Sequence, residues 1–234
     1  ISEMKTDFIN NMTHEFKTPV ATIMIASESL RDPEIAADNK RVNRLANIIY
    51  DENVRLGNHI ERVLNIAKLE KEDLKIEKTD VYLNGLMDGV LDSMQLQINK
   101  VNGVLIKELN AEEDLVIGDE LHLSNVMFNL VDNAIKYSLT PPEITVKSYN
   151  TNDKVILSVS DKGMGMTKEQ QEKIFDQFYR IPTGNVHNVK GFGLGLSYVN
   201  DIIKRFDGKI IVKSEKDKGT TFEVILPLKK ANKN

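Results

Sequence analysis

A near-heptad spacing of apolar residues over positions 39–72 constrains the fold of this 234-residue chain more than any other feature. Charged residues separate the members of the seam, which are Val42, Leu45, Ile49, Leu56, Ile60, Val63, Ile66 or Ala67, and Leu69. This pattern predicts one long amphipathic helix. Such a helix is stable only when its apolar stripe is covered by another element.

Apolar residues also recur at helical intervals over residues 1–30, at Phe8, Met12, Phe16, Val20 and Ile23. The sequence Arg-Asp-Pro-Glu at 31–34 breaks this pattern, so we predict an antiparallel helical hairpin. Because a hairpin alone leaves its stripes uncovered, we expect two copies to form a homodimeric four-helix bundle. The heptads alone fit a solitary coiled-coil stalk equally well.

The pattern changes at the polar stretch 71–80. Beyond it, helices are predicted over residues 83–100, 119–137, 167–175 and 194–206. Strands are predicted over residues 104–109, 115–117, 143–149, 155–160, 209–214 and 221–226. The fold class is therefore α+β, with a helical hairpin followed by a two-layer α/β sandwich that has helices on one face of a mixed sheet. We place the domains at 1–73 and 81–234, with a hinge at 74–80.

Composition excludes several partners. The formal net charge is −4 and basic residues are interspersed with acidic ones, so no nucleic-acid partner is expected. There is no cysteine, which excludes disulfides and thiolate metal sites. No apolar run reaches the roughly 20 residues needed to span a bilayer, and no signal peptide is found. Because the chain begins with Ile1 rather than Met, we expect a part of a longer protein whose sensing segment lies outside this sequence.

The segment 8–19 places His14 beside Glu15, with Thr18 one helical turn further on. A His-Glu-x-x-His motif would indicate a zinc protease, but Thr18 stands where the second histidine is needed. Pro19 lacks a backbone N–H, so we expect it to kink or loosen the helix here. A neutral imidazole has one nucleophilic nitrogen, so His14 can attack phosphorus.

The other three histidines lack this context. We predict His59 in the helical seam, His122 on a helix surface and His187 in a loop.

Asn129 and Asn133 are four residues apart on a predicted helix, so their carboxamides share a face. Amide oxygens are hard ligands that suit magnesium bound to a triphosphate, and Lys136 could meet a phosphate. Taken alone, two asparagines at this spacing more often cap or solvate a helix.

Asp161 follows an apolar strand and leads into Gly163 and Gly165. Its carboxylate can accept a hydrogen bond from the exocyclic amine of adenine, and the glycines allow the backbone to approach a ligand closely. An aspartate-led glycine turn without a ligand is the alternative.

Gly191, Gly193 and Gly195 precede the helix predicted at 194–206, whose amino end favours phosphate. Leu196 stands where a dinucleotide fingerprint needs its third glycine, and no P-loop lysine follows, so both of those nucleotide folds are excluded.

Residues 179–190 have little to bury and predict a mobile lid. Arg180 lies at its root, where a guanidinium could close on a γ-phosphate, although a plain surface arginine is an alternative. We expect Phe175 and Phe178 to anchor the lid by packing.

Five motifs therefore follow one another, at residues 8–19, 129–138, 161–165, 175–180 and 191–196. Together they resemble the H, N, G1, F and G2 boxes of sensor histidine kinases, two-component enzymes whose ATP domain belongs to the superfamily of DNA gyrase and heat-shock chaperones. The resemblance covers nearly the whole chain. Residues 219–222 resemble the last glycine box, and we assign them no role beyond turn and strand.

The resemblance implies an ATP-dependent protein-histidine kinase core with a dimerisation and histidine phosphotransfer domain followed by a catalytic ATP-binding domain. His14 would be the phosphoacceptor, and Glu15 would orient its ring or take its proton. The phosphoryl group would pass to an aspartate of a response regulator. Thr18 would hold a water for removing it again. We expect the cytoplasmic portion of a membrane-anchored bacterial sensor, in contact with the membrane only through segments outside this sequence.

For the nucleotide site, the resemblance implies ATP with Mg²⁺ held by Asn129 and Asn133. The other residues that it implies for ATP binding are Lys136, Tyr137, Asp161, Gly163, Gly165, Arg180, Gly191, Gly193, Gly195 and Leu196. Phe192 replaces a small hydroxyl residue that is frequent in the family, which leaves the backbone to bind phosphate at that position.

Two alternatives fit the sequence less well. An ATPase that drives conformational change would place a glutamate base where Asn129 stands, so a water-activating carboxylate is missing. A docking scaffold with a dead nucleotide site would not need Asn133, Asp161 and the three glycines.

Overall fold

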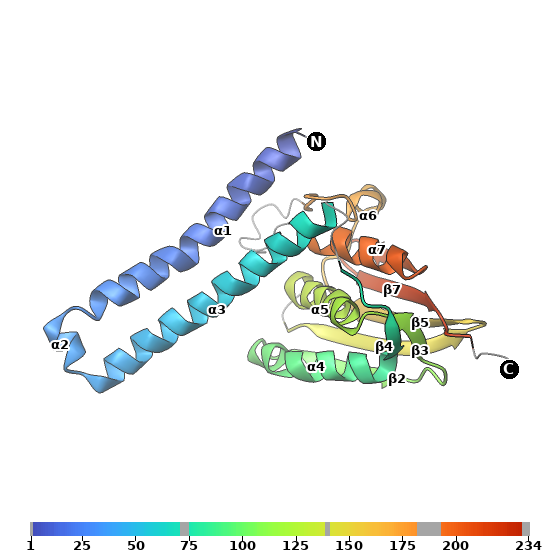
Figure 1. Cartoon of the computed structure of the whole chain (residues 1–234), viewed down its shortest axis with the longest axis horizontal. Coiled ribbons are helices and arrows are strands. Elements are labelled where there is room, and N and C mark those ends of the chain that lie inside the picture. The colour runs from blue at the N-terminus through green and yellow to red at the C-terminus, as the bar shows by residue number, and fades with distance from the viewer. Residues whose placement is uncertain (1, 71–74, 139–140, 182–192, 231–234) are drawn as a thin grey trace. The chain divides into compact units, whose positions relative to one another are not determined.

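The computed structural model of the chain describes the backbone of residues 2–70, 75–138, 141–181 and 193–230 (Figure 1). Side chains in these ranges are described except at residues 2–9, 11, 14, 58–59 and 61–70. The chain divides into two compact units, with the division between Leu74 and Lys75.

The first unit is a hairpin of two long helices, α1 (Ser2–Ser29) and α3 (Asn39–Glu70), which pack along each other (Figure 1). Between them lies a short helix, α2 (Pro33–Ala36), at the predicted break. Asp32 caps it by accepting a hydrogen bond from the backbone N–H of Glu34, and Pro33 occupies its first turn. The four-residue helix was not predicted, since it is too short to show a periodic pattern.

Helix α1 continues through Pro19 without interruption. Proline has no backbone N–H, so the carbonyl of Glu15 loses the donor that an ordinary residue would supply. Pro19 therefore does not end the helix, and the kink or loosening stays a prediction.

The second unit contains a mixed five-stranded sheet with strand order β2-β4-β5-β7-β6. Its strands are β2 (Val104–Leu109), β4 (Glu143–Thr151), β5 (Lys154–Asp161), β6 (Lys209–Glu215) and β7 (Gly219–Pro227). Strands β2 and β4 are parallel and the remaining pairs are antiparallel. A separate two-stranded sheet joins β1 (Thr79–Tyr82) to β3 (Leu115–Gly118).

Helices cover one face of the larger sheet, as predicted (Figure 1). They are α4 (Leu83–Lys100), α5 (Glu120–Tyr137) and α7 (Gly195–Arg205), with the short α6 (Lys168–Lys173) beyond β5. Alternate residues of β7 are buried beneath them, among them Phe222, Val224 and Leu226. The α+β class with a helical region and a mixed-sheet sandwich is confirmed. No helix in the described ranges is long and apolar enough to cross a membrane.

Candidate functional site

Asn129 on α5 meets the first residue of α7. The Asn129 Nδ2 donates a hydrogen bond to the carbonyl of Asn125 at 2.7 Å, which fixes the amide plane. A Cβ added to Gly195 would lie 2.8 Å from Asn129 Oδ1, so a larger residue at 195 would displace the Asn129 amide. The second and fifth motifs therefore come together, with the Asn129 oxygen directed at the amino end of α7.

The amino end of α7 suits an anion. Leu194 is the N-cap residue, and its apolar side chain makes no capping hydrogen bond. The first amides of a helix lack intrahelical acceptors, and the helix dipole adds positive potential there. Phosphate is a ligand that such an end binds well. Leu196 lies half-buried in this first turn.

Gly193 joins the fourth motif to the fifth. Its φ of +69° lies in the left-handed region, and its carbonyl accepts a hydrogen bond from the N–H of Phe178 at 3.0 Å. An added Cβ would lie 2.9 Å from the carbonyl oxygen of Tyr179. The contact places the residues just before Arg180 against the glycine segment. Gly191, Phe192 and the predicted lid from residue 182 onward, His187 included, lie outside the described residues.

Asp161 ends β5 in a largely buried position. Burial raises the pKa of its carboxyl group from 3.8 to about 6, opposed by backbone hydrogen bonds from Gly163 and Thr220. The Gly163 N–H donates to Asp161 Oδ1 at 2.7 Å. Thr220 is its register partner on β7. The carboxylate is thus held by main-chain donors at the sheet end, which leaves it able to accept one further hydrogen bond.

The glycine turn after Asp161 packs on the end of α5. An added Cβ on Gly163 would lie 2.2 Å from the carbonyl oxygen of Tyr137, and the same carbonyl accepts a hydrogen bond from the N–H of Met164 at 3.1 Å. Gly165 has a φ of +58° and lies against the backbone of Glu215. The second and third motifs are therefore adjacent, and the glycines are needed for backbone contacts whether or not a ligand is bound.

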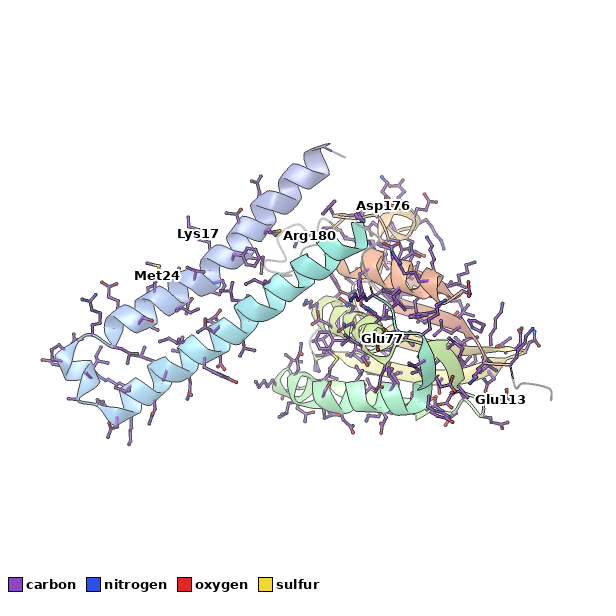
Figure 2. The ribbon with its side chains drawn as sticks, in the orientation of Figure 1. Lys17, Met24, Glu77, Glu113, Asp176 and Arg180 are labelled. Carbon is purple, nitrogen blue, oxygen red and sulfur yellow. The ribbon has the colours of Figure 1, made fainter. Side chains whose placement is uncertain are left out.

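Tyr137 is the last residue of α5, and Arg180 comes near it from another segment. Burial raises the pKa of the Tyr137 hydroxyl, and the positive charge of Arg180 opposes that rise, so the two side chains interact. Arg180 is labelled in Figure 2 at the start of the segment whose continuation is not described. Asn133 lies half-buried on the same helix, one turn beyond Asn129.

Lys136 forms an ion pair with Asp132, a residue that the sequence analysis did not identify. Lys136 Nζ lies 2.5 Å from Asp132 Oδ2, and the Asp132 side chain is 10% exposed. The two residues are one helical turn apart, the spacing at which ion pairs form along a helix. That spacing was the available signal. The Lys136 ammonium has two further N–H donors that could meet a phosphate.

His122 is not on the surface as predicted. Its side chain is buried, and its Nδ1 lies 2.9 Å from the Tyr198 hydroxyl on α7. The prediction was wrong because His122 precedes Val126 and Leu130 by one and two turns, which puts it on the packed face of α5. The neighbouring Leu121 is the exposed residue, at 67%.

In the helical unit, His14 lies on α1, but its side chain and that of His59 are outside the described part. Glu15 is half-buried, with Oε2 4.0 Å from Arg55 Nη2 on α3. Arg55 Nη1 lies 3.5 Å from Glu52 Oε2 as well. Thr18 has an exposed side chain. The Glu15 carboxylate thus has a cation beside it that no sequence pattern indicated.

The donor set limits the metals that fit. The described residues contain no group of three or more histidine, cysteine or acidic side chains that could hold a metal ion by themselves. Asn129 offers an amide oxygen beside a helix amino end, where an anion would sit. A hard cation shared between amide oxygens and phosphate fits this arrangement, as magnesium does.

The fold joins a helical hairpin to an α/β sandwich in which the second, third, fourth and fifth motifs lie next to one another, and comparison with known proteins identifies the family. Residues 4–72 match the His Kinase A (phospho-acceptor) domain. Residues 118–230 match the family of histidine kinase-, DNA gyrase B- and HSP90-like ATPases.

The chain belongs to the sensor histidine kinases of two-component systems. Sensor protein RprX of Bacteroides fragilis (strain YCH46) is 40% identical over 232 residues, which are 98% of this chain and 45% of that protein. Sensor protein SrrB of Staphylococcus aureus is 31% identical over 97% of this chain and 39% of its own length. The chain therefore spans less than half the length of these curated relatives.

Two solved structures extend the likeness. The catalytic domain of histidine kinase ThkA is 31% identical, with a TM-score of 0.57, over 65% of this chain and 96% of that one. ThkA in complex with response regulator protein TrrA is 26% identical, with a TM-score of 0.63, over 95% of this chain and 61% of that one.

Proposed function

We propose that this chain is the kinase core that autophosphorylates His14 with ATP and passes the phosphoryl group to an aspartate of a response regulator. The observation that carries the proposal is the meeting of Asn129 with Gly195 at the amino end of α7, where the N-cap residue Leu194 makes no side-chain capping bond. This phosphate-suited corner lies in the part that matches the ATPase family, while His14 lies in the part that matches the phospho-acceptor domain.

In the first reaction, an imidazole nitrogen of His14 attacks the γ-phosphorus of ATP. A nitrogen–phosphorus bond forms, the bond from the γ-phosphorus to the bridging oxygen breaks, and ADP leaves. Glu15 accepts the imidazole proton, for which it must loosen its ion pair with Arg55. In the second reaction, a carboxylate oxygen of the regulator attacks the same phosphorus, an oxygen–phosphorus bond forms and the nitrogen–phosphorus bond breaks, and His14 regains its proton and leaves as neutral imidazole.

The nucleotide is held by residues of the α/β unit. Asp161 accepts a hydrogen bond from the adenine amine, beside the close backbone of Gly163 and Gly165. Arg180 binds the γ-phosphate. Lys136 and Tyr137 line the nucleotide, and the phosphates lie against the segment containing Gly191, Gly193, Gly195 and Leu196.

Asn129 and Asn133 would hold Mg²⁺, which would supply positive charge against the phosphate oxygens.

The proposed partners are a second copy of the chain and a response regulator. The hairpin leaves apolar side chains exposed, as a dimeric bundle requires. ThkA has been crystallised with its response regulator, and a similar receiver would dock on the hairpin near His14. Thr18 would then hold a water against the phosphoaspartate, which gives the core phosphatase activity too. We assign dimerisation and phosphotransfer to residues 1–73, a hinge to 74–80 and ATP binding to 81–234, all within the cytoplasmic part of a bacterial sensor anchored through segments outside this sequence.

A labelling assay tests the kinase proposal. The chain is incubated with γ-labelled ATP and Mg²⁺, and the labelled protein is treated with acid or base. Phosphohistidine predicts a label that acid removes and base does not. A label that both acid and base remove would indicate an acyl phosphate, and a label stable to acid would indicate a hydroxyl ester; either result contradicts His14 as the acceptor.

A further inference from the structure

A buried polar contact joins helices α5 and α7 at a distance from the proposed ligands. His122 Nδ1 and the Tyr198 hydroxyl lie 2.9 Å apart, and the two residues are only 9% and 6% exposed. Burial raises the pKa of the Tyr198 hydroxyl to about 12, so it stays protonated and can donate. Buried polar groups of this kind are costly unless paired, so the contact holds the helices at one separation.

The same hydroxyl is connected to Asn129. Tyr198 also bonds to the side chain of Asn125, and the backbone carbonyl of Asn125 accepts the hydrogen bond from Asn129 Nδ2. Asn129 in turn presents Oδ1 to Gly195, three residues before Tyr198 on α7. These contacts link α5 to α7 in a continuous path that runs from Tyr198 to the phosphate-suited corner.

His122 is itself fixed at the amino end of α5. Its backbone N–H donates to Asp119 Oδ1 at 3.1 Å, and Asp119 Oδ2 accepts a hydrogen bond from the N–H of Glu77 at 2.9 Å. Glu77, labelled in Figure 2, belongs to the segment that leads into β1. If α7 shifts, the His122 side chain can follow Tyr198 only by disturbing this helix cap.

We propose that His122 and Tyr198 are positioning residues for the triphosphate end of the nucleotide. Their hydrogen bond sets the separation of α5 and α7, so the Asn129 oxygen and the first amides of α7 converge on one phosphate and its metal ion. Neither residue touches the ligand. This inference rests on the proposed ATP site and adds the hydrogen bond that holds α5 and α7 at a fixed separation.

The central test is Tyr198→Phe in the full chain, which removes the hydroxyl and keeps the ring. The dissociation constant for Mg-ATP, measured by calorimetric titration, should rise about tenfold, and so should the KM for ATP in autophosphorylation. The kcat at saturating ATP should change by less than about twofold, because positioning is restored once the ligand is bound. Ser148→Ala is the matched control, since Ser148 is 1% exposed and bonded to Asn84 Oδ1 at 2.7 Å within the same unit.

A second pair of variants keeps the test decisive if Tyr198→Phe folds poorly. His122→Asn keeps an acceptor near the position of Nδ1 and should retain most of the affinity, whereas His122→Leu should lose about as much as Tyr198→Phe. The double variant His122→Leu/Tyr198→Phe should lose little more than either single one, since both remove the same contact.

The outcomes separate the two proposals. A parent chain that does not bind Mg-ATP overturns the proposed function, and the inference with it. A parent chain that binds, with Tyr198→Phe and His122→Leu binding equally well, overturns the inference alone. The inference is also overturned if Ser148→Ala weakens binding as much as Tyr198→Phe, because the effect is then one of general stability.

Discussion

The helical unit and the α/β unit bury their apolar side chains to very different extents. Among the described side chains of the hairpin, only the small residues Ala26 and Pro19 are buried. The α/β unit encloses large ones completely, including Leu83, Met87 and Ile202. Its sheet and helices therefore cover one another, whereas two helices packed side by side cannot cover both of their stripes.

Some apolar side chains of the hairpin are exposed and could be covered by a partner. Met24 and Ile25 are 65% and 66% exposed, and Tyr50 on α3 is 68% exposed. Figure 2 shows Met24 on the side of α1 turned away from α3. The near-heptad spacing of α3 makes these stripes suitable for a second hairpin. One unit encloses its own core, whereas the described side chains of the other stay largely exposed, so nucleotide binding and phosphate acceptance should respond to different perturbations.

The largest expected effect comes from His14→Ala, which removes the proposed nucleophile from the hairpin. Autophosphorylation should fall by about a thousandfold or more, because no other imidazole has a carboxylate and hydroxyl at this spacing. The dissociation constant for Mg-ATP should stay within about twofold of the parent value, since the nucleotide lies in the other unit. Quantitative labelling and a binding titration on the same preparation measure both. Substantial labelling of the variant would remove His14 as the acceptor.

Ile25→Glu tests whether the hairpin is half of a core. A carboxylate placed in an apolar interface is unpaired and desolvated, so the dimer dissociation constant should rise about a hundredfold or more. Sedimentation velocity over a range of concentrations measures it. Asn47→Glu on α3 is the control, because it adds the same charge at an exposed polar position. If Ile25→Glu and Asn47→Glu dimerise alike, the exposed apolar stripe is not the dimer interface.

Asp161→Asn separates nucleotide recognition from stability within the α/β unit. The amide keeps an acceptor for the Gly163 N–H but removes the charge. Mg-ATP affinity should fall about thirtyfold, and the preference for ATP over GTP should shrink, because the acceptor for the adenine amine is altered. Competitive titration with both nucleotides measures this. Unchanged discrimination would show that Asp161 does not contact the base.

The same substitution should make the free protein more stable at neutral pH. The folded-state pKa of Asp161, about 6, lies above its unfolded value of 3.8, so the folded state holds the proton more tightly. The stability that this group contributes is complete below pH 3.8 and is lost as the pH rises through 6. Removing the carboxyl should therefore raise the free energy of unfolding by about 2 kcal/mol at pH 8, with little gain near pH 4. Urea unfolding at both pH values checks the difference, with Asp153→Asn in the exposed turn before β5 as the control.

Much of the fold could be predicted because the long elements carry strong periodicities. The ends of α3, α4, α5 and α7 fall within two residues of the predicted ones. Strand β1 was missed, since Thr79-Asp80-Val81-Tyr82 has one buried residue and pairs only with β3. Its conformation comes from that tertiary pairing, which a local pattern does not contain.

The candidate site, like the fold, was predictable only in part. Motifs predicted Asn129, Asp161 and the glycines as site residues, but the contact between Asn129 and Gly195 depends on how α5 and α7 pack. Arg55 was missed because it approaches Glu15 from another helix. His122 was misplaced because one histidine among apolar residues does not reveal the partner that makes its burial tolerable.

The smallest expected effect concerns Thr18, which tests whether the hairpin does more than accept phosphate. Its side chain is exposed one helical turn beyond His14, so it can face a docked receiver without taking part in attack on ATP. Thr18→Ala should slow dephosphorylation of the regulator about fivefold while autophosphorylation and transfer change by less than about twofold, because a hydroxyl can hold a water that alanine cannot. Thr18→Ser keeps the hydroxyl and should keep both activities. If Thr18 only adjusts the helix before Pro19, kinase and phosphatase rates will fall together, so measuring both on each variant decides between the two roles.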